Sequence, residues 1–313
     1  QLPMIRDPFS HQCEYLLTEH TNIIELLKQD RYDVFIAENF DMCGTGLSHL
    51  IGAKSFIPVS STNLFDNQAY QIGLPLLSAI IPGSFGRAIR DGSLFDRLNN
   101  LIALGTSLYM WRSMESDTEA AFKRVHGHAF PDFDEIMAKS AFVLVNSDPF
   151  VDFARPTMRK IVEIGGIGIK DVKPLTEEWE QLLALRPRTV VFSLGSCKLA
   201  KFIPNVILRK WIPQNDLLAT GRVNGLIVHG GKASTMEAAT RGVPSIFIPM
   251  YGDQFRNSAA AAHAGFGHVL NKDYLRDVEK IEAALHHILD DEQTKKRTAD
   301  TKRMIESRPF TPK

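Results

Sequence analysis

The chain has 313 residues, of which 44% are hydrophobic and 23% are charged, so it is long enough for two domains with sizeable cores. Thirty-six basic residues balance thirty-six acidic ones, which excludes the basic face of a nucleic-acid-binding protein and a polybasic membrane patch. No apolar run approaches the roughly 20 residues of a membrane-spanning helix, and no N-terminal signal pattern is present. Cys13, Cys43 and Cys197 have no metal-binding spacing and form no paired framework, so they do not indicate a compartment.

The first half of the chain alternates between helix and strand, as in an α/β domain. Ser10 is expected to cap a helix whose apolar residues recur at helical spacing as far as Leu27. Residues 33–37 form a continuously apolar run, typical of a strand buried in a parallel sheet. The further expected elements are a strand at 55–59, a loop at 64–92, helices at about 93–126 and 132–139, and a strand at 141–146.

Residues 165–187 have the composition of an interdomain linker, with three glycines, two prolines and one acidic helical turn. We therefore expect one domain at 1–168 and a second at 169–313. In the second, the expected strands are 189–194, 206–208, 225–228, 244–249 and 267–270, and the expected helices are 232–241, 254–264 and a charged tail at about 274–307.

One connection in the second domain is too short. Only about ten residues separate Gly195 from the strand expected at Val206, and Pro204 is one of them. A parallel crossover with its helix needs at least about 10–12 residues plus turns. Either these two strands are not parallel neighbours, or a piece of the domain is absent after Ser196.

The sequence His229-Gly230-Gly231 joins an expected strand to an expected helix. Glycines there let the backbone approach a ligand closely, and the helix N-terminus offers free N–H groups to a phosphate. A histidine at the carboxyl end of the strand, with Ser234 in the first helical turn, could neutralise a diphosphate. Glu237, one turn further on, could accept hydrogen bonds from ribose hydroxyls.

Four more residues lie at the same expected rim of the sheet. Asp253 and Gln254 follow the next strand and could bind sugar hydroxyls, while Trp211 and Gln214 precede the unit and could stack on a base and read its edge. Each of these residues alone is more often structural: a tryptophan in the core, a glutamate on a solvated helix face. Their shared position at strand ends and first turns favours a binding site.

These residues resemble a known family. Trp211 to Leu218, the His229–Gly231 turn, Ser234, Glu237 and the Asp253-Gln254 pair look like the signature of UDP-glycosyltransferases, and the animal glucuronosyltransferase branch with its nematode-like members is the nearest match. The resemblance implies an α/β fold of the GT-B type, with two Rossmann-like domains facing a cleft. It also implies transfer of a hexose or glucuronic acid from a UDP-sugar to a small lipophilic acceptor with inversion, without a metal or other cofactor.

The resemblance further assigns residue roles. Trp211 would stack on uracil, Gln214 would contact the nucleotide, Ser196, Gly231, His229 and Ser234 would hold the diphosphate, Glu237 the ribose, and Asp253 and Gln254 the sugar. Glu38 matches the acidic partner of the catalytic base. By the same likeness, we expect the luminal side of the endoplasmic reticulum membrane and assembly with copies of itself or of family members.

The sequence departs from the family pattern in several places. The family's base histidine has no counterpart, Ala233 stands where the family has Asn, and a helix and strand are missing after Ser196. The N-terminal domain is therefore expected to be incomplete, and the chain truncated at both ends. An alternative to an active transferase is a catalytically impaired UDP-binding remnant, or a partner of a full-length transferase. A nicotinamide-dependent oxidoreductase and a hydrolase lack their motifs.

Overall fold

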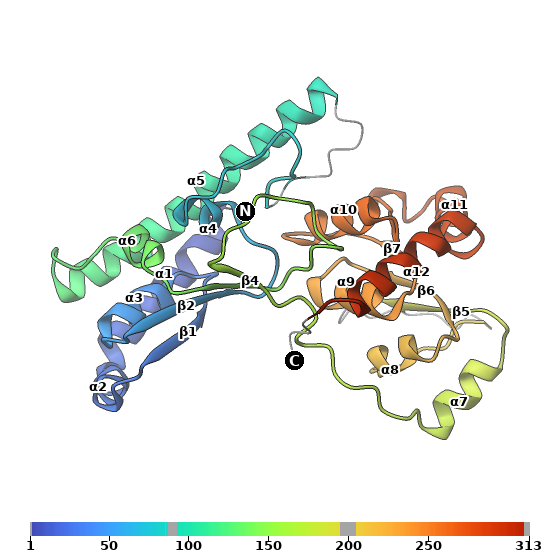
Figure 1. Cartoon of the computed structure of the whole chain (residues 1–313), viewed down its shortest axis with the longest axis horizontal. Coiled ribbons are helices and arrows are strands. Elements are labelled where there is room, and N and C mark those ends of the chain that lie inside the picture. Colours follow the sequence, from blue (N-terminus) through green and yellow to red (C-terminus); the bar gives the residue numbers. More distant parts are fainter. Residues whose placement is uncertain (1, 85, 87–92, 195–204, 310–313) are drawn as a thin grey trace. The chain divides into compact units, whose positions relative to one another are not determined.

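The computed structural model describes residues 2–84, 86, 93–194 and 205–309, and the chain divides into two compact units (Figure 1). The first unit comprises residues 1–147 and 154–164, and the second comprises residues 148–153 and 165–313. In the described residues, each unit contains one four-stranded parallel sheet, which gives the α/β class expected from the sequence. Segment 148–153 belongs to the second unit, although it precedes the single domain boundary expected at residue 168.

The sheet of the first unit has the strand order β1-β2-β3-β4, and all neighbours are parallel. Its strands are β1 (Val34–Glu38), β2 (Ser55–Ser60), β3 (Val143–Val145) and β4 (Ile161–Glu163). Its helices are α1 (Leu2–Glu19), α2 (Thr21–Asp30), α3 (Cys43–Leu50), α4 (Asp66–Gln71), α5 (Leu94–His126) and α6 (Phe133–Ala138).

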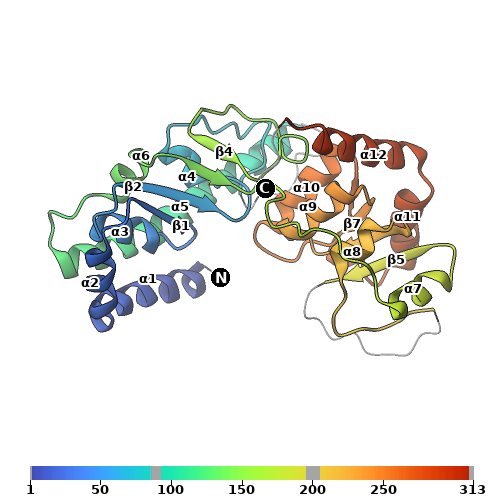
Figure 2. The same ribbon diagram turned by 60° about the horizontal axis from the view of Figure 1, so that its bottom comes forward.

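Helices cover one face of this sheet. α3 packs against β1 and β2, and α1 packs against α3 and α5 (Figure 2). The core between them contains Leu17, Trp111, Phe122 and Phe133, which are fully buried. Burial of these large apolar side chains, each contributing about 1.5–3 kcal/mol, holds the helix layer on the sheet.

Three expectations about the secondary structure of this unit are wrong. Ser10 does not cap a helix, because α1 begins at Leu2 and continues through Pro8. Strand β1 is not buried on both faces: it is an edge strand, so Val34 and Ile36 are exposed while Phe35 packs on the core. The segment expected as a loop at 64–92 contains the short helix α4, whose polar residues are buried. They are buried by packing against α5 and α6, which the local sequence does not predict.

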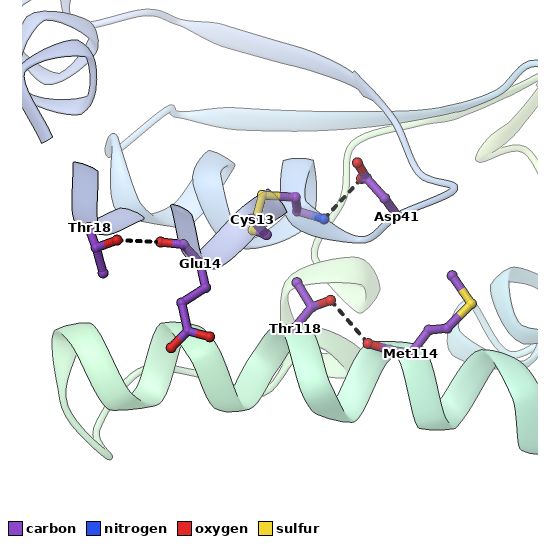
Figure 3. The surroundings of a disulfide bond; sticks show 7 residues. Cys13, Glu14, Thr18, Asp41, Met114 and Thr118 are labelled. Carbon is purple, nitrogen blue, oxygen red and sulfur yellow. Dashed lines mark hydrogen bonds between the residues drawn. A yellow bond between two sulfur atoms is a disulfide. The ribbon is translucent and has the colours of Figure 1, made fainter. Parts of the chain in front are cut away.

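A disulfide joins Cys13 of α1 to Cys43, the first residue of α3, with 30 residues of sequence separation (Figure 3). The expectation that the cysteines form no pair is therefore wrong. The pairing depends on α1 lying against α3, which brings the two Cα atoms to 5.7 Å, and no local pattern in the sequence encodes that contact.

The sheet of the second unit has the order β5-β6-β7-β8, again wholly parallel. Its strands are β5 (Thr189–Ser193), β6 (Val223–Val228), β7 (Ser245–Phe247) and β8 (Gly267–Val269). Its helices are α7 (Glu177–Ala184), α8 (Gln214–Ala219), α9 (Lys232–Arg241), α10 (Gln254–Ala264), the 3-10 turn η1 (Lys272–Tyr274), α11 (Val278–Leu289) and α12 (Glu292–Glu306).

The strand expected at 206–208 does not form. β6 occupies the place beside β5, Val206 makes only an isolated β-bridge, and Val206, Ile207 and Leu208 are exposed. The chain between β5 and this segment is too short for a helical crossover, so residues 206–208 cannot reach a parallel position in the sheet. In the described part of the chain, no helix is long and apolar enough to cross a membrane.

Candidate functional site

The His229–Gly231 turn after β6 places the imidazole of His229 close to the backbone at the start of α9. Gly230 has a φ of +88°, and a Cβ atom there would lie 2.3 Å from the Ser258 hydroxyl, so only glycine fits this turn. A Cβ atom at Gly231 would lie 2.7 Å from Nε2 of His229, which places the imidazole against the start of α9. The Nδ1 atom of His229 is buried and has no hydrogen-bond partner among the described residues.

The N-terminus of α9 has no side-chain cap, because its N-cap residue is Gly231. The first N–H groups of a helix have no partner within the helix, and they carry the positive end of its dipole. Together with the imidazole of His229, this end of α9 has the chemistry of a phosphate-binding site.

Three predicted residues meet beside this helix end. The amide nitrogen of Gln214, the first residue of α8, donates hydrogen bonds to the Ser234 hydroxyl at 3.2 Å and to the Glu237 carboxylate at 2.7 Å. Burial raises the pKa of Glu237, and the hydrogen bond from Gln214 opposes this effect. The arrangement presents a carboxylate and a hydroxyl one helical turn apart.

Trp211 is 85% exposed. The structural alternative, a tryptophan buried in the core, is therefore wrong. An exposed indole three residues before Gln214 leaves a large aromatic face available to a planar ligand.

Asn257 of α10 links the His229–Gly231 turn to the loop that contains Asp253. Its amide nitrogen donates to the carbonyl of Gly230 at 3.0 Å and to the Asp253 carboxylate at 2.8 Å. Gln254 is buried, and its side-chain oxygen accepts hydrogen bonds from the N–H groups of Met250 and Tyr251. The Gln254 amide oxygen thus orders the loop, and its contact with a sugar stays a prediction.

Charged side chains lie beneath the turn. Burial lowers the pKa of Lys232, the first residue of α9, and the carboxylates of Asp152 and Asp148 counteract this shift. Arg256 of α10 lies 3.4 Å from the Asp152 carboxylate, and Arg308 lies 2.6 Å from Asp148. The charges therefore fix segment 148–153 to the second unit below the His229–Gly231 turn.

The predicted acidic residue Glu38 ends β1 in the first unit, and its carboxylate accepts a hydrogen bond from the Ser61 N–H at 2.9 Å. Although the residue as a whole is exposed, desolvation of its carboxylate raises the pKa of Glu38. Asp41 follows, and it accepts from the N–H of Cys43 at 3.1 Å, next to the disulfide (Figure 3). Glu38 and Asp41 line a cavity of about 470 Å³ with Leu16 and Phe35.

Ser196, the remaining predicted residue, lies outside the described residues. Asn257 and Lys232 were not predicted. The spacing of Asn257 four residues after Asp253 could have indicated their pairing on one helix face, whereas burial of Lys232 depends on segment 148–153, distant in sequence. Among the described residues, no group of three or more histidine, cysteine or acidic side chains is placed to hold a metal ion.

The chain has the GT-B fold, built from two Rossmann-like domains. The structure titled "Crystal Structure Analysis of the Glycotransferase of kitacinnamycin" matches with a TM-score of 0.64 and 16% identity, over 97% of this chain and 78% of that one. The spinosyn forosaminyltransferase SpnP matches with a TM-score of 0.58 and 18% identity, over 90% and 73%.

Within that class, the chain belongs to the UDP-glucoronosyl and UDP-glucosyl transferase family, whose model matches residues 2–204 and 187–313. The putative UDP-glucuronosyltransferase ugt-48 of Caenorhabditis elegans is 26% identical, over 97% of this chain and 65% of the relative. UDP-glucuronosyltransferase 3A1 of Xenopus laevis is 26% identical, over 96% and 64%.

The chain thus spans about two thirds of the length of these curated relatives. The alignment with ugt-48 extends over 347 positions, more than the 313 residues of the chain, so that relative carries aligned residues without a counterpart here.

Proposed function

We propose that the second unit binds a UDP-sugar and that the protein transfers the hexose or glucuronic acid to a small lipophilic acceptor, with inversion and without a metal. The observation that carries this proposal is the hydrogen-bonded group of Gln214, Ser234 and Glu237 beside the uncapped start of α9. It combines acceptors for ribose hydroxyls with donors for a diphosphate within one helical turn.

The UDP-sugar would lie beside the start of α9, between Trp211 and the loop at Asp253. Uracil stacks on the exposed Trp211, Glu237 accepts from the ribose, and the diphosphate lies against Gly231, His229 and Ser234, with Ser196 as a further ligand. Asp253 and Gln254 take the sugar hydroxyls. Donors aimed at the departing diphosphate stabilise the charge that develops as the bond to the anomeric carbon breaks.

The acceptor would use the first unit. The cavity beside β1 has an apolar wall at Leu16 and Phe35 and a carboxylate at Glu38, which suits a lipophilic molecule carrying a hydroxyl. The hydroxyl oxygen attacks the anomeric carbon as its proton passes to a base, a contribution of about 10²–10⁴-fold. Glu38 matches the acidic partner of that base, and the family's base histidine itself has no counterpart in this sequence.

We place the protein on the luminal side of the endoplasmic reticulum membrane, in a detoxifying role, with assembly into oligomers with itself or with family members. The Cys13–Cys43 disulfide supports an oxidising compartment, because such bonds persist there and are rare in the cytosol.

A second candidate function is UDP binding without transfer, either alone or as the partner of a full-length transferase. Ala233 favours it: this exposed methyl group in the first turn of α9 replaces a polar contact with the diphosphate. Calorimetric titration with UDP and turnover of UDP-glucose and UDP-glucuronate separate the two. Binding with turnover supports transfer, binding without turnover supports the second candidate, and the absence of binding contradicts both.

A further inference from the structure

The cavity beside β1 combines apolar walls with negative charge. It lies within the first unit, has a volume of about 470 Å³ and is lined by residues of α1, β1 and α3. Leu16, Phe35 and Leu47 supply apolar side chains, and Glu38 and Asp41 are its two acidic residues. A cavity of this size and lining suits a small organic molecule.

The charges of the two carboxylates are not balanced by the chain. Among the described residues, no lysine or arginine lines the cavity, and neither carboxylate forms an ion pair. Glu38 accepts a hydrogen bond from the Ser61 N–H at 2.9 Å, and Asp41 accepts one from the Cys43 N–H at 3.1 Å (Figure 3). Peptide N–H groups satisfy the oxygens but carry no full positive charge, so the cavity keeps the negative charge of both carboxylates.

Both carboxylates are also partly removed from water. Burial raises the pKa of Asp41 and of Glu38, and at Glu38 the negative charge of Asp41 adds to this effect while hydrogen bonds from Ser61 oppose it. A cation within about 4–6 Å favours the ionised form of such a pair. The rings of Tyr15 and Phe35 line the same cavity, and aromatic faces attract cations. The wall therefore favours a ligand with a positively charged group.

The apolar part of the wall indicates that this charge belongs to an organic molecule. A calcium or magnesium ion needs about six or more oxygen ligands. Among the described residues, no group of three or more histidine, cysteine or acidic side chains is placed to hold a metal. A bare ion would also leave Leu16, Phe35 and Leu47 in contact with water, whereas a hydrocarbon skeleton would cover them.

We propose that the acceptor is a lipophilic amine that also carries a hydroxyl group, with its ammonium group beside Asp41 and its hydroxyl beside Glu38. The inference rests on the proposed function, which makes this cavity the acceptor site, and it adds the charge of the acceptor. A lipophilic carboxylic acid would bring a third negative charge into the cavity, so it is a poor ligand.

Calorimetric titration of the full chain with phenylbutylamine, phenylbutanol and phenylbutanoate tests this preference. The three probes share one apolar part and differ in the charge of the terminal group. The amine is expected to bind about tenfold more tightly than the alcohol, and the acid more weakly than either. Added sodium chloride should weaken binding of the amine and leave binding of the alcohol unchanged, because salt screens only the charged pair.

Two isosteric variants test the location of the charge. Asp41→Asn should lower the affinity for the amine about tenfold and leave the affinity for the alcohol unchanged. Glu38→Gln should also weaken binding of the amine, so the test does not depend on the folding of one variant. Glu135→Gln, which changes an exposed carboxylate on α6 outside the cavity, should alter neither affinity.

Equal affinities for the amine and the alcohol, tighter binding of the acid, or no binding of any probe would overturn the proposal. So would amine binding that neither Asp41→Asn nor Glu38→Gln weakens. The titrations contain no UDP-sugar, so a chain that binds the amine but not UDP contradicts the transferase and keeps the charge preference of the cavity. A chain that transfers sugar to phenylbutanol in preference to its amino-alcohol analogue contradicts the inference alone.

Discussion

The side-chain amide of Gln214 donates a 2.7 Å hydrogen bond to the carboxylate of Glu237. Gln214 begins α8 and Glu237 lies in α9, so this contact fixes two helices that flank the His229–Gly231 turn. Burial raises the pKa of Glu237, and the amide hydrogen bond favours the ionised form that can accept from two hydroxyl groups. In the proposed donor complex, this carboxylate would accept hydrogen bonds from the ribose.

Glu237→Gln is expected to weaken UDP binding about 10- to 100-fold, because a hydrogen bond to a charged group contributes about 1.5–3 kcal/mol. Calorimetric titration measures this change. The affinity of the unmodified chain should also fall as the pH is lowered through the raised pKa of Glu237, since protonation removes the acceptor. Glu282→Gln, an exposed carboxylate on α11, serves as the control, and equal affinities of the two variants would contradict the role of Glu237.

Gly230→Ala is expected to destabilise the second unit and to abolish UDP binding. The residue has a φ of +88°, and its new methyl group would lie 2.3 Å from the Ser258 hydroxyl. The positive φ costs about 1–2 kcal/mol for alanine, and overpacking against α10 adds about 1–3 kcal/mol. Urea unfolding followed by circular dichroism measures the loss.

Gly221→Ala is the matched control for this substitution. Gly221 has a φ of +71°, but a Cβ atom there meets no described atom within 4 Å. It therefore carries the conformational penalty without the clash. If both variants lose the same free energy of unfolding, close packing at Gly230 is not the reason for its glycine.

The parts of the fold that the sequence predicts well are those with a strong local signal. The strands at Val34, Ser55 and Thr189 and the helices α5, α9 and α10 follow from apolar runs and from terminal glycines such as Gly242 and Gly265. The misplaced elements depend on tertiary context. β1 is half exposed because it is an edge strand, and segment 206–208 forms no strand because its connection to β5 is too short for a helical crossover.

The same division holds for the candidate site. Ser234 and Glu237 were predictable because they follow the end of β6 in the first turns of α9. Gln214 was assigned to the same rim on a strand at 206–208 that does not form, and its hydrogen bonds to both residues depend on the packing of α8 against α9. The buried charges of Lys232, Arg256 and segment 148–153 were not predictable, because a crossing of the chain from one unit to the other has no periodic signature.

Removing the Cys13–Cys43 disulfide is expected to lower the free energy of unfolding of the first unit by about 3–4 kcal/mol. The bond closes a loop with 30 residues of sequence separation, and the loss reflects the greater chain entropy of the unfolded state. Cys13→Ala with Cys43→Ala, and separately the addition of a reductant, should show this loss in urea unfolding. The reductant should have no effect on the double variant, and an effect of equal size there would show that the reductant does not act through this disulfide.

Glu115 of α5 should make the first unit less stable as the pH rises. Its buried carboxylate accepts from Gln71 at 2.6 Å and from Arg112 at 3.2 Å. Burial raises the pKa of Glu115 from 4.5 to about 7, and the nearby carboxylate of Asp134 adds to the shift while Arg112 opposes it. The folded chain therefore keeps a proton that the unfolded chain has already released.

The free energy of unfolding should consequently fall by about 3 kcal/mol between the unfolded and folded pKa values of Glu115 as the pH rises. Glu115→Gln cannot release a proton, so it should lose this part of the pH dependence and be more stable than the unmodified chain above neutral pH. Urea unfolding at a series of pH values measures both. Glu135→Gln, an exposed carboxylate on α6, is the control. Parallel curves for Glu115→Gln and the unmodified chain would mean that the folded and unfolded chains release the Glu115 proton at the same pH, which contradicts the raised pKa.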